Sequence, residues 1–339
     1  MSDSGWKMNA LSPARKLQQT LAFARMHGAK HIALCYYKRL PAFITLLLRL
    51  SNLRVTALIR ADGGQASPSF FTSSSLPILS PEAACSFEQI DAIVVVDQPN
   101  FSWILRLIEQ VIQRDLLVLP ADPTWVVQSS IASLTQQTAW RESVPVEYVA
   151  RSGLSGHYLE FGTFWGRSFF PAYFRFRHWL KGDFYAFDSF QGLPKPKELE
   201  TITTGGDFRE HTYNFGLNSF MALSEMLEVD QERLKVIPGF YAETLVGHAP
   251  SLYGLEPGSV SVCVIDCDLY ESTAQVLEFV TPLLEQGGLI YFDDWRLCRA
   301  SREVGERAAA LDWMKANPTI ELVEIYQDHW QNQWFIFNN

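Results

Sequence analysis

The sequence predicts an α/β protein in which two domains are each built around a mainly parallel sheet. Short apolar runs, typical of buried strands, alternate with segments whose apolar residues recur every three or four positions, as on one face of a helix. The chain has 339 residues, which is more than one domain usually holds. A third observation separates the halves: strands of the second half end in acidic clusters, whereas the first half has none.

Composition and charge exclude several classes of protein. Hydrophobic residues make up 47% of the chain and charged residues 19%, as in ordinary globular proteins. The net charge of −9 argues against nucleic acid as a main partner. No apolar run reaches the length of a membrane span, and the five cysteines form no CxxC pair. We therefore expect a cytoplasmic protein with reduced cysteines, without a signal peptide or membrane span.

Residues 12–122 are predicted to form the first domain, a small doubly wound α/β unit. Its first helix begins at Ser12-Pro13 and ends at Gly28, where each residue suits its position at a helix terminus. Residues 123–150 are expected to form a helical connector. Parallel strands are expected at 31–36, 54–59, 92–97 and 116–119, and further helices at 41–50, 81–87 and 103–114.

The first domain lacks a phosphate-binding fingerprint. The turn after its first strand, residues 35–41, contains no glycine, so a pyrophosphate cannot approach the backbone as it does in dinucleotide-binding folds. A structural, dimerising or carbohydrate-docking module is therefore favoured. The alternative is an unusual nucleotide or sugar-nucleotide site, which only Lys38 and Arg39 support. Because symmetric pairing is the commonest form of assembly, a homodimer is expected.

The second domain, residues 151–339, is organised around a strand, helix, strand unit within residues 261–295. Strands are predicted at 262–265 and 289–292, with a crossover helix between them that a glycine pair at 287–288 closes. The two strands are then parallel neighbours, so their carboxyl ends lie side by side. Acids follow both strands: Asp266, Asp268, Asp293 and Asp294.

The acids at these two strand ends predict a metal site. Clustered carboxylates repel one another and raise one another's pKa unless a cation neutralises them. A site made only of oxygen ligands suits magnesium or a similar divalent ion. The alternative is that each acid merely ends its strand and caps the next helix.

A glycine turn and two acid-ended strands predict a small-molecule site at the same sheet edge. The strand at 157–161 carries Glu160 and leads into Gly162 and Gly166, which permit a tight turn and close approach of a ligand. The Glu160 carboxylate disfavours a diphosphate and suits a cationic ligand, or one with a ribose and an amino group. Asp188 ends the strand at 184–188, where an acid can accept both hydroxyls of a ribose. Alternatively, Asp188 and Ser189 cap the following turn.

Five motifs follow one another in the second domain: YLEFGTFWGRS at 158–168, FDSFQGLP at 187–194, GFYAETL at 239–245, IDCDLYEST at 265–273 and GGLIYFDDW at 287–295. In sequence and in order they resemble the macrocin O-methyltransferase family of S-adenosylmethionine-dependent sugar O-methyltransferases. The resemblance covers about residues 156–337 and implies a Rossmann-like class I methyltransferase fold with a mainly parallel seven-stranded sheet. Arg167 departs from the family pattern, where a small residue is common, as does Trp295, where tyrosine is more usual.

The resemblance also implies cofactors and site residues. It places S-adenosylmethionine at the glycine turn, with Glu160 and Gly162 at its methionine end and Asp188 at its ribose. It further implies that Mg²⁺ binds at three acids. The expected metal ligands are Asp266, Asp293 and Asp294, and the candidate cofactor-binding residues are Glu160, Gly162, Gly166, Ser168, Asp188, Ser189 and Gly239.

The expected reaction is magnesium-dependent transfer of the methyl group of S-adenosylmethionine to a sugar hydroxyl, on a polysaccharide, a nucleotide sugar or a glycosylated natural product. Chelation of the sugar by the ion would lower the pKa of the hydroxyl, and Asp266 or His329 is the candidate base. Trp330 and Trp334 share a face of the last predicted strand, 330–337, and are candidates for stacking on a sugar ring. Two alternatives stay open: a metal-dependent glycosyltransferase that uses the DxD at 266–268, and a non-catalytic sugar-binding protein with this fold.

A polar segment at 200–214 is too long for a simple connector. Loops of this kind are often lids over a site. A solvated loop without such a role is the alternative.

Overall fold

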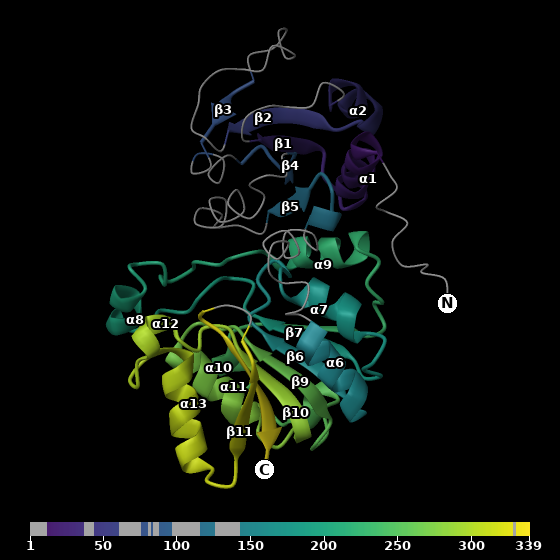
Figure 1. Cartoon of the computed structure of the whole chain (residues 1–339). Coiled ribbons are helices and arrows are strands. Elements are labelled where there is room, and N and C mark those ends of the chain that lie inside the picture. Colours follow the sequence, from purple (N-terminus) through teal and green to yellow (C-terminus); the bar gives the residue numbers. More distant parts are fainter. Residues whose placement is uncertain are drawn as a thin grey trace. The chain divides into compact units, whose positions relative to one another are not determined.

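The structure, a computed structural model, forms two compact units, each with its own sheet (Figure 1). The first unit comprises Met1–Ser129 and Tyr213–Val229, and the second comprises Ser130–Thr212 and Asp230–Asn339. Within the chain, the structure describes residues 12–36, 44–60, 76–80, 83, 88–96, 116–125, 143–327 and 330–339.

The sheet of the first unit is parallel throughout and has the order β3-β2-β1-β4-β5. Chain order reverses between β1 and β4, which confirms the predicted doubly wound sheet. The short strand β3 was not predicted, because two residues give no alternating pattern. The predicted helices at 81–87 and 103–114 fall largely or wholly outside the described residues. The strands are β1 His31–Tyr36, β2 Arg54–Arg60, β3 Ile78–Leu79, β4 Ala92–Val95 and β5 Leu117–Pro120.

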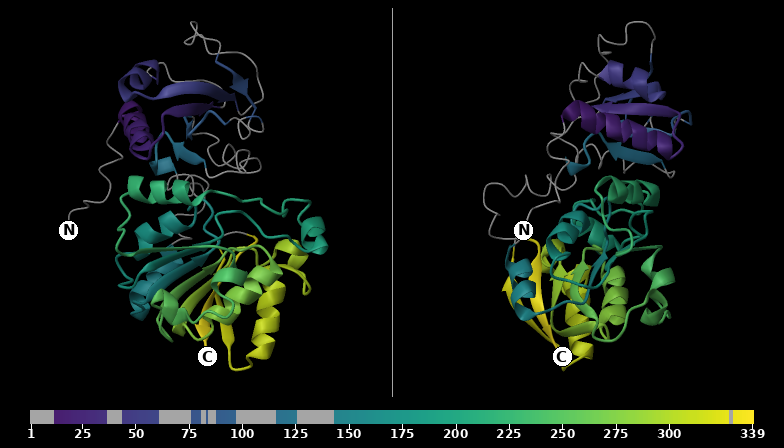
Figure 2. Two further views of the ribbon diagram at one scale, coloured as in Figure 1. Left: turned by 180° about the vertical axis from the view of Figure 1, so that it is seen from behind. Right: turned by 90° about the vertical axis from the view of Figure 1, so that its right-hand side faces the viewer.

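Helices α1 (Pro13–Met26) and α2 (Ile44–Ser51) pack against each other beside this sheet (Figure 2). Ser12 caps α1 through a hydrogen bond from Arg15 N to its hydroxyl, 3.4 Å, and a proline follows in the first turn, as predicted. Leu17 and Leu21 on α1 join the apolar core formed by the strands. The apolar core therefore consists of the side chains that the helix and strand patterns of the sequence place on the inner faces of these elements.

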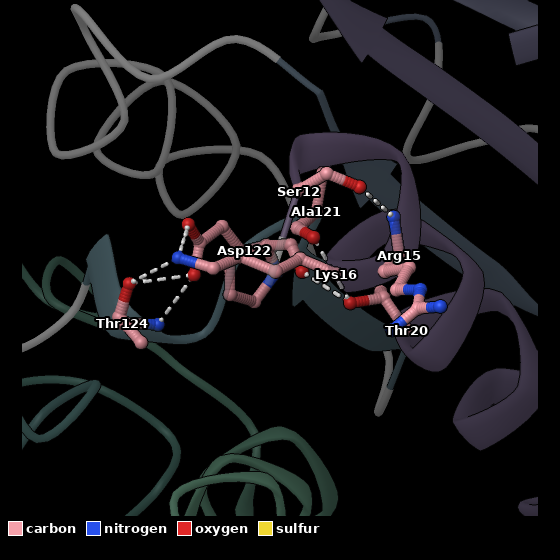
Figure 3. Close-up of polar contacts among 8 residues, drawn as sticks. Ser12, Arg15, Lys16, Thr20, Ala121, Asp122 and Thr124 are labelled. Atoms are coloured by element: carbon pink, nitrogen blue, oxygen red, sulfur yellow. Dashed lines mark hydrogen bonds and ion pairs between the residues drawn. The ribbon is translucent and has the colours of Figure 1, made fainter. Parts of the chain in front are cut away.

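A buried ion pair joins α1 to the end of β5 (Figure 3). The Lys16 ammonium lies 2.6 Å from a carboxylate oxygen of Asp122, and Thr124 donates to the other oxygen from its hydroxyl, 2.6 Å, and its N–H, 3.0 Å. The Thr20 hydroxyl donates to Pro120 O, 3.0 Å. Because both charges are paired and hydrogen-bonded, this cluster is tolerated in the interior and fixes the chain where it leaves the sheet.

Helix α9 (Leu217–Met226) lies in the second half of the sequence but belongs to the first unit. The Ser219 hydroxyl accepts from Val118 N, 2.8 Å, and donates to Leu116 O, 3.2 Å. Val118 lies in the edge strand β5, whose outer backbone groups would otherwise lack a partner. The Ser219 hydroxyl thus forms backbone hydrogen bonds that a neighbouring strand would otherwise form at this edge of the sheet.

The sheet of the second unit has seven strands in the order β11-β12-β10-β9-β6-β7-β8. Only β12 runs antiparallel to its neighbours, so the predicted mainly parallel seven-stranded sheet is confirmed. The strands are β6 His157–Phe161, β7 Phe184–Asp188, β8 Leu234–Pro238, β9 Val260–Ile265, β10 Leu284–Phe292, β11 Glu321–Tyr326 and β12 Gln333–Asn338.

Helices cover both faces of this sheet (Figure 1). Helices α11 and α13 pack against each other on one face, and α6 and α7 lie on the other. None of the helices in the described part of the chain is long and apolar enough to cross a membrane. The helices are α6 Ser143–Ser152, α7 Phe169–Phe176, α8 Glu198–Thr203, α10 Tyr241–Thr244, α11 Tyr270–Val280, α12 Leu297–Ala300 and α13 Gly305–Ala316, with a 3₁₀ turn at Pro250–Tyr253.

The predicted end of the crossover helix is wrong. Helix α11 ends at Val280, just before Pro282, and not at the glycine pair. A proline lacks the N–H that a further helical turn requires. Gly287 has φ +78° and lies where the pairing of β10 with β9 shifts register, so the glycines form an irregularity within β10.

Replacing Ser219 by alanine should destabilise the first unit. The change leaves the buried Val118 N–H without its partner, which costs about 1–3 kcal/mol of the free energy of unfolding. Thermal or urea unfolding measures the loss. The matched control is Ser224→Ala on the same helix, because the Ser224 hydroxyl donates within α9, to Met221 O. Equal unfolding midpoints for the two variants would contradict the role given to Ser219.

Candidate functional site

The glycine turn after β6 brings two neighbouring strands into close contact. Gly162 has φ +88°, and a Cβ atom there would lie 1.7 Å from the carbonyl oxygen of Asp266. Gly166 has φ +81°, and its Cβ would lie 2.1 Å from the ring of Phe170. Glycine is therefore required at both positions, for backbone conformation and for space. The turn lies directly beside the first acid after β9.

Asp188, at the end of β7, holds this turn in place. Its Oδ2 accepts from Thr163 N and Phe164 N, both at 2.8 Å, and its Oδ1 accepts from Phe190 N at 2.7 Å. Gly239 N in turn donates to Asp188 O, 2.9 Å. Burial raises the pKa of Asp188, and the three backbone N–H groups oppose that rise. The cap of the turn after β7, which was the alternative to a ribose-binding role, is thus present, and Asp188 binds the glycine turn as well.

Ser189 takes part in the same turn. Its hydroxyl donates to Gly192 O, 2.8 Å, and accepts from Gln191 N, 3.0 Å. A carboxylate has about four acceptor positions, and backbone groups use three of those on Asp188. A ligand hydroxyl can therefore still be accepted there.

Glu160 lies within β6 and is fully buried. It accepts hydrogen bonds from the Tyr158 hydroxyl and from the Ser168 hydroxyl, the latter at 2.7 Å. Burial raises the pKa of Glu160 to about 7, although both hydrogen bonds work in the other direction. The structure thus brings together two of the candidate cofactor-binding residues, Glu160 and Ser168, and the carboxyl group fixes the start of α7.

The Thr163 hydroxyl supplies a test of whether this turn suits a polar ligand. It is buried near the Asp188 carboxylate, yet no partner for it in the described part of the chain meets hydrogen-bond geometry. Buried polar groups are nearly always hydrogen-bonded. The turn therefore places a buried hydroxyl beside a carboxylate, which fits a ligand that carries hydroxyl or amino groups.

The four acids after β9 and β10 meet at the same edge of the sheet. β9 and β10 pair in parallel with Ile265 opposite Phe292, and Asp293 N donates to Ile265 O, 3.0 Å. The carboxyl groups of Asp268 and Asp294 lie within hydrogen-bonding reach of each other. We call the turn with Asp266 and Asp268 after β9 and the turn with Asp293 and Asp294 after β10 the two acidic turns. They lie side by side, as predicted.

Burial and mutual repulsion dominate the electrostatics of this acidic cluster. Burial, followed by the charge of Asp293, raises the pKa of Asp266 well above its usual range. Burial and the charge of Asp294 do the same to the pKa of Asp268. Burial raises the pKa of Asp294 to about 7, with the Asp293 charge adding to the rise. A cation would relieve this repulsion.

The donor set fits an oxygen-preferring divalent ion in its chemistry, because every side chain in the cluster offers carboxylate oxygens. As the side chains stand, no three His, Cys, Asp or Glu residues in the described ranges are placed to hold one ion together. Binding by Asp266, Asp293 and Asp294 would therefore need side-chain rotation. Tyr291 donates to Asp293 Oδ1, and Gln331 donates to Asp294 Oδ1, 3.1 Å. Since the Asp294 carboxyl also lies within hydrogen-bonding reach of Asp268, an ion bound to Asp294 would replace that contact.

Two further acids in the cluster were not predicted. Glu306 on α13 accepts from Cys267 N, Asp268 N and Asp294 N, and Glu200 on α8 accepts from Lys197 N, Tyr270 N and Gly305 N. Both side chains are buried. The signal for Glu306 was its place on an apolar stripe with Ala309, Ala310 and Trp313, the spacing of a buried helix face.

The candidate base His329 and its neighbour Asp328 lie outside the described residues. Trp334 is buried, 9% exposed, against Tyr291, with ring centroids 4.6 Å apart. Trp330 is 58% exposed. Of the two tryptophans considered for stacking on a sugar, only Trp330 is therefore accessible.

The chain matches one family model over most of the second unit. A model of the family described as Macrocin-O-methyltransferase (TylF) matches residues 140–322, which is more than half of the chain. The match covers the glycine turn, Asp188 and both acidic turns.

Two curated proteins of Streptomyces are similar in sequence. The chain is 30% identical over 162 residues to an 8-demethyl-8-(2,3-dimethoxy-alpha-L-rhamnosyl)-tetracenomycin-C 4'-O-methyltransferase of Streptomyces olivaceus, covering 45% of this chain and 59% of the relative. It is 28% identical over 154 residues to a demethyldecarbamoylnovobiocin O-methyltransferase of Streptomyces niveus, covering 42% and 53%. The chain thus spans somewhat more than half the length of these relatives.

Solved structures were matched at lower identity. The O-methyltransferase NovP is 20% identical, with 58% of this chain and 79% of that chain covered and a TM-score of 0.44. The calicheamicin methyltransferase CalS11 is 18% identical, with 63% and 91% covered and a TM-score of 0.46.

The contact between Gly162 and the turn after β9 should not tolerate a methyl group. Gly162→Ala adds a clash with the Asp266 carbonyl to the cost of a left-handed conformation, which alone is about 1–2 kcal/mol. The control is Gly205→Ala, at φ +68° with nothing within 4 Å of the added Cβ. We expect a much lower melting temperature for Gly162→Ala than for Gly205→Ala. Similar melting temperatures would show that the close approach imposes no constraint.

The raised pKa of Glu160 should make stability depend on pH. Between the ordinary value of 4.5 and about 7 the folded chain binds more protons at this group than the unfolded chain does. The contribution of Glu160 to the free energy of unfolding therefore falls as pH rises through this window, and levels off above it. Glu160→Gln should flatten the slope in urea unfolding measured across the window. The exposed Glu232→Gln is the control, and an identical slope in all three proteins would refute the assignment.

Proposed function

Since the chain belongs to the macrocin O-methyltransferase family, we propose that it transfers the methyl group of S-adenosylmethionine to a hydroxyl of a sugar, with the help of Mg²⁺. The acceptor class is a glycosylated small molecule. Cofactor, metal and acceptor would meet at the carboxyl edge of the seven-stranded sheet, where open α/β sheets bind ligands.

One observation carries the proposal: the glycine turn and the acidic cluster are adjacent. Gly162 touches the backbone of Asp266, so a ligand at the turn and an ion at the acids would be close neighbours. A methyl donor and an activated hydroxyl must lie in line and within about 3–3.5 Å of each other. Neither a strand cap nor an isolated metal site requires such an arrangement.

The residues of the turn bind and orient the methyl donor in this proposal. S-adenosylmethionine supplies an electrophilic methyl group when bound. Asp188 and Ser189 take the ribose side, and Glu160, Gly162, Gly166 and Ser168 form the wall at the methionine side, with Gly239 behind Asp188. Within this wall the buried Glu160 carboxyl group holds Tyr158 and Ser168 by accepting hydrogen bonds from both hydroxyls.

The acidic cluster orients the acceptor and takes its proton. Asp266, Asp293 and Asp294 would hold Mg²⁺, which lowers the pKa of hydroxyls that bind to it. Asp266 is the candidate general base that takes the proton of the acceptor hydroxyl. His329 remains a second candidate for the base. Trp330, with its exposed ring, is the candidate for stacking on the sugar.

The choice of acceptor follows from the relatives. The name of one relative contains a rhamnosyl tetracenomycin and the name of the other contains demethyldecarbamoylnovobiocin, both of them small molecules. We propose the same class of acceptor for this chain.

We further propose that the chain divides functionally into a first domain at residues 12–122, a connector at 123–150 and a methyltransferase domain at 151–339. The first domain serves for pairing of two chains or for acceptor docking. The enzyme is then a cytoplasmic homodimer.

Calorimetry with S-adenosylmethionine tests the cofactor assignment. Asp188→Ala removes three charge-assisted hydrogen bonds of the turn and should weaken binding by about 1–3 kcal/mol. Asp230→Ala is the control, because Asp230 is exposed and accepts only locally, from Glu232 N. Unchanged affinity in Asp188→Ala would count against the site. Binding of a nucleotide sugar in place of S-adenosylmethionine would favour a glycosyltransferase.

Removal of divalent ions tests the metal. With a glycosylated acceptor, excess chelator should abolish methyl transfer and added Mg²⁺ should restore it, while S-adenosylmethionine still binds in calorimetry. Full transfer in chelator would refute the metal mechanism and leave the methyltransferase assignment intact.

A further inference from the structure

Glu306 links the two acidic turns through a single carboxylate. Its Oε1 accepts from Cys267 N, 3.1 Å, and Asp268 N, 3.3 Å, in the turn after β9. Its Oε2 accepts from Asp294 N, 2.9 Å, in the turn after β10. The side chain is 0% exposed. The distance between the two turns is therefore set by the width of one carboxylate.

A buried carboxylate at position 306 is electrostatically unfavourable. Burial, and then the charge of Asp294, raise the pKa of Glu306 well above its usual range. In the described part of the chain no Lys, Arg or His forms an ion pair with it. A neutral side chain could fill the same space at lower electrostatic cost. What a neutral amide cannot do is accept N–H groups with both of its terminal atoms.

The backbone that carries Glu306 to this place is strained. Cys298, Arg299 and Ala300 have φ of 49°, 58° and 51°, three non-glycine residues in succession in the left-handed region. Each costs about 1–3 kcal/mol, and such strain gathers at functional sites. These three residues lie between Asp294 and the start of α13. The left-handed turn that they form reverses the chain, so that Glu306 at the start of α13 lies beside the two acidic turns.

A second buried carboxylate fixes the start of α13. Glu200 Oε1 accepts from Tyr270 N, 2.8 Å, and Gly305 N, 3.3 Å, and so joins α8, α11 and α13. Gly305 directly precedes Glu306. The polar segment at 200–214 is thus anchored at one end by a buried acid, and Glu306 is held from both sides.

We propose that Glu306 is a positioning residue that sets the spacing of the two acidic turns, so that Asp266 on one turn and Asp293 and Asp294 on the other can bind the same divalent ion. The inference rests on the metal site of the proposed function. Glu306 itself touches neither ion nor acceptor. Without the hydrogen bonds of Glu306 the two turns can move apart. The affinity for the divalent ion then falls, whereas the glycine turn keeps its conformation.

The test is Mn²⁺ binding, followed by the electron paramagnetic resonance of the free ion, together with S-adenosylmethionine binding in calorimetry. Glu306→Gln retains one acceptor oxygen, but its amide nitrogen meets a backbone N–H, so one turn loses its bond. We expect the dissociation constant for Mn²⁺ to rise about 10–100-fold, the usual effect of losing a residue that orients metal ligands. The affinity for S-adenosylmethionine should stay unchanged, because the hydrogen bonds of Glu306 go to the turns after β9 and β10 and not to the glycine turn.

Two further variants complete the design. Glu306→Asp keeps both acceptor oxygens on a shorter side chain and should bind Mn²⁺ better than Glu306→Gln, and it also serves if the glutamine variant fails to fold. Glu285→Gln is the matched control: Glu285 accepts from Ser261 at the opposite end of β9 and β10, and its loss should leave Mn²⁺ affinity unchanged.

Three results would overturn the inference. Unchanged Mn²⁺ affinity in Glu306→Gln would show that the bridge is not needed. Equal losses of Mn²⁺ and S-adenosylmethionine affinity, with a lowered melting temperature, would show a general structural role. Failure of the unaltered protein to bind Mn²⁺ would overturn the metal site itself, and this outcome is distinct because it appears before any substitution is made.

Discussion

The burial of like charges at one edge of a sheet is the constraint on which the second unit depends. Glu160, Asp188 and the acids after β9 and β10 lie at neighbouring strand ends, and burial raises the pKa of most of them. Such a group is costly for a fold that needs only stability. The chain limits the cost with hydroxyl and backbone donors: Tyr158 and Ser168 for Glu160, and three N–H groups for Asp188. Such donors only partly compensate the negative charge of the carboxylates after β9 and β10. A bound cation would compensate the rest.

The same hydrogen bonds also fix geometry. Asp188 ties the glycine turn to the turn after β7, and Gly162 lets that turn touch the backbone at Asp266. Glu306 then ties the turn after β9 to the turn after β10. A continuous set of backbone contacts therefore runs from the proposed methyl donor to the proposed metal. An enzyme that must align a methyl group with a hydroxyl gains from such rigidity.

Sequence patterns predicted the parts of this arrangement that depend on local signals. Three strands, β1, β6 and β7, have the predicted bounds, because each is a short apolar run with clear ends. The meeting of Asp266 with Asp293 followed from the strand, helix, strand unit, because its two strands are parallel and their carboxyl ends lie side by side. Ser219 and Glu306 were missed, since Ser219 meets Val118, 101 positions away, and Glu306 meets backbone groups that are 39, 38 and 12 positions away. The glycine pair at 287–288 was misplaced, because glycines end helices and also form irregularities in strands.

The central claim is that one sheet edge holds a methyl donor at the glycine turn and a divalent ion between the two acidic turns. A crystal structure with S-adenosylhomocysteine and Mn²⁺, with anomalous diffraction recorded to locate the manganese, tests this claim most directly. The account predicts the ribose beside Asp188 and one anomalous peak bonded to Asp266, Asp293 and Asp294. A peak elsewhere, or a ligand that leaves Asp188 and the turn at 162–168 untouched, would contradict it.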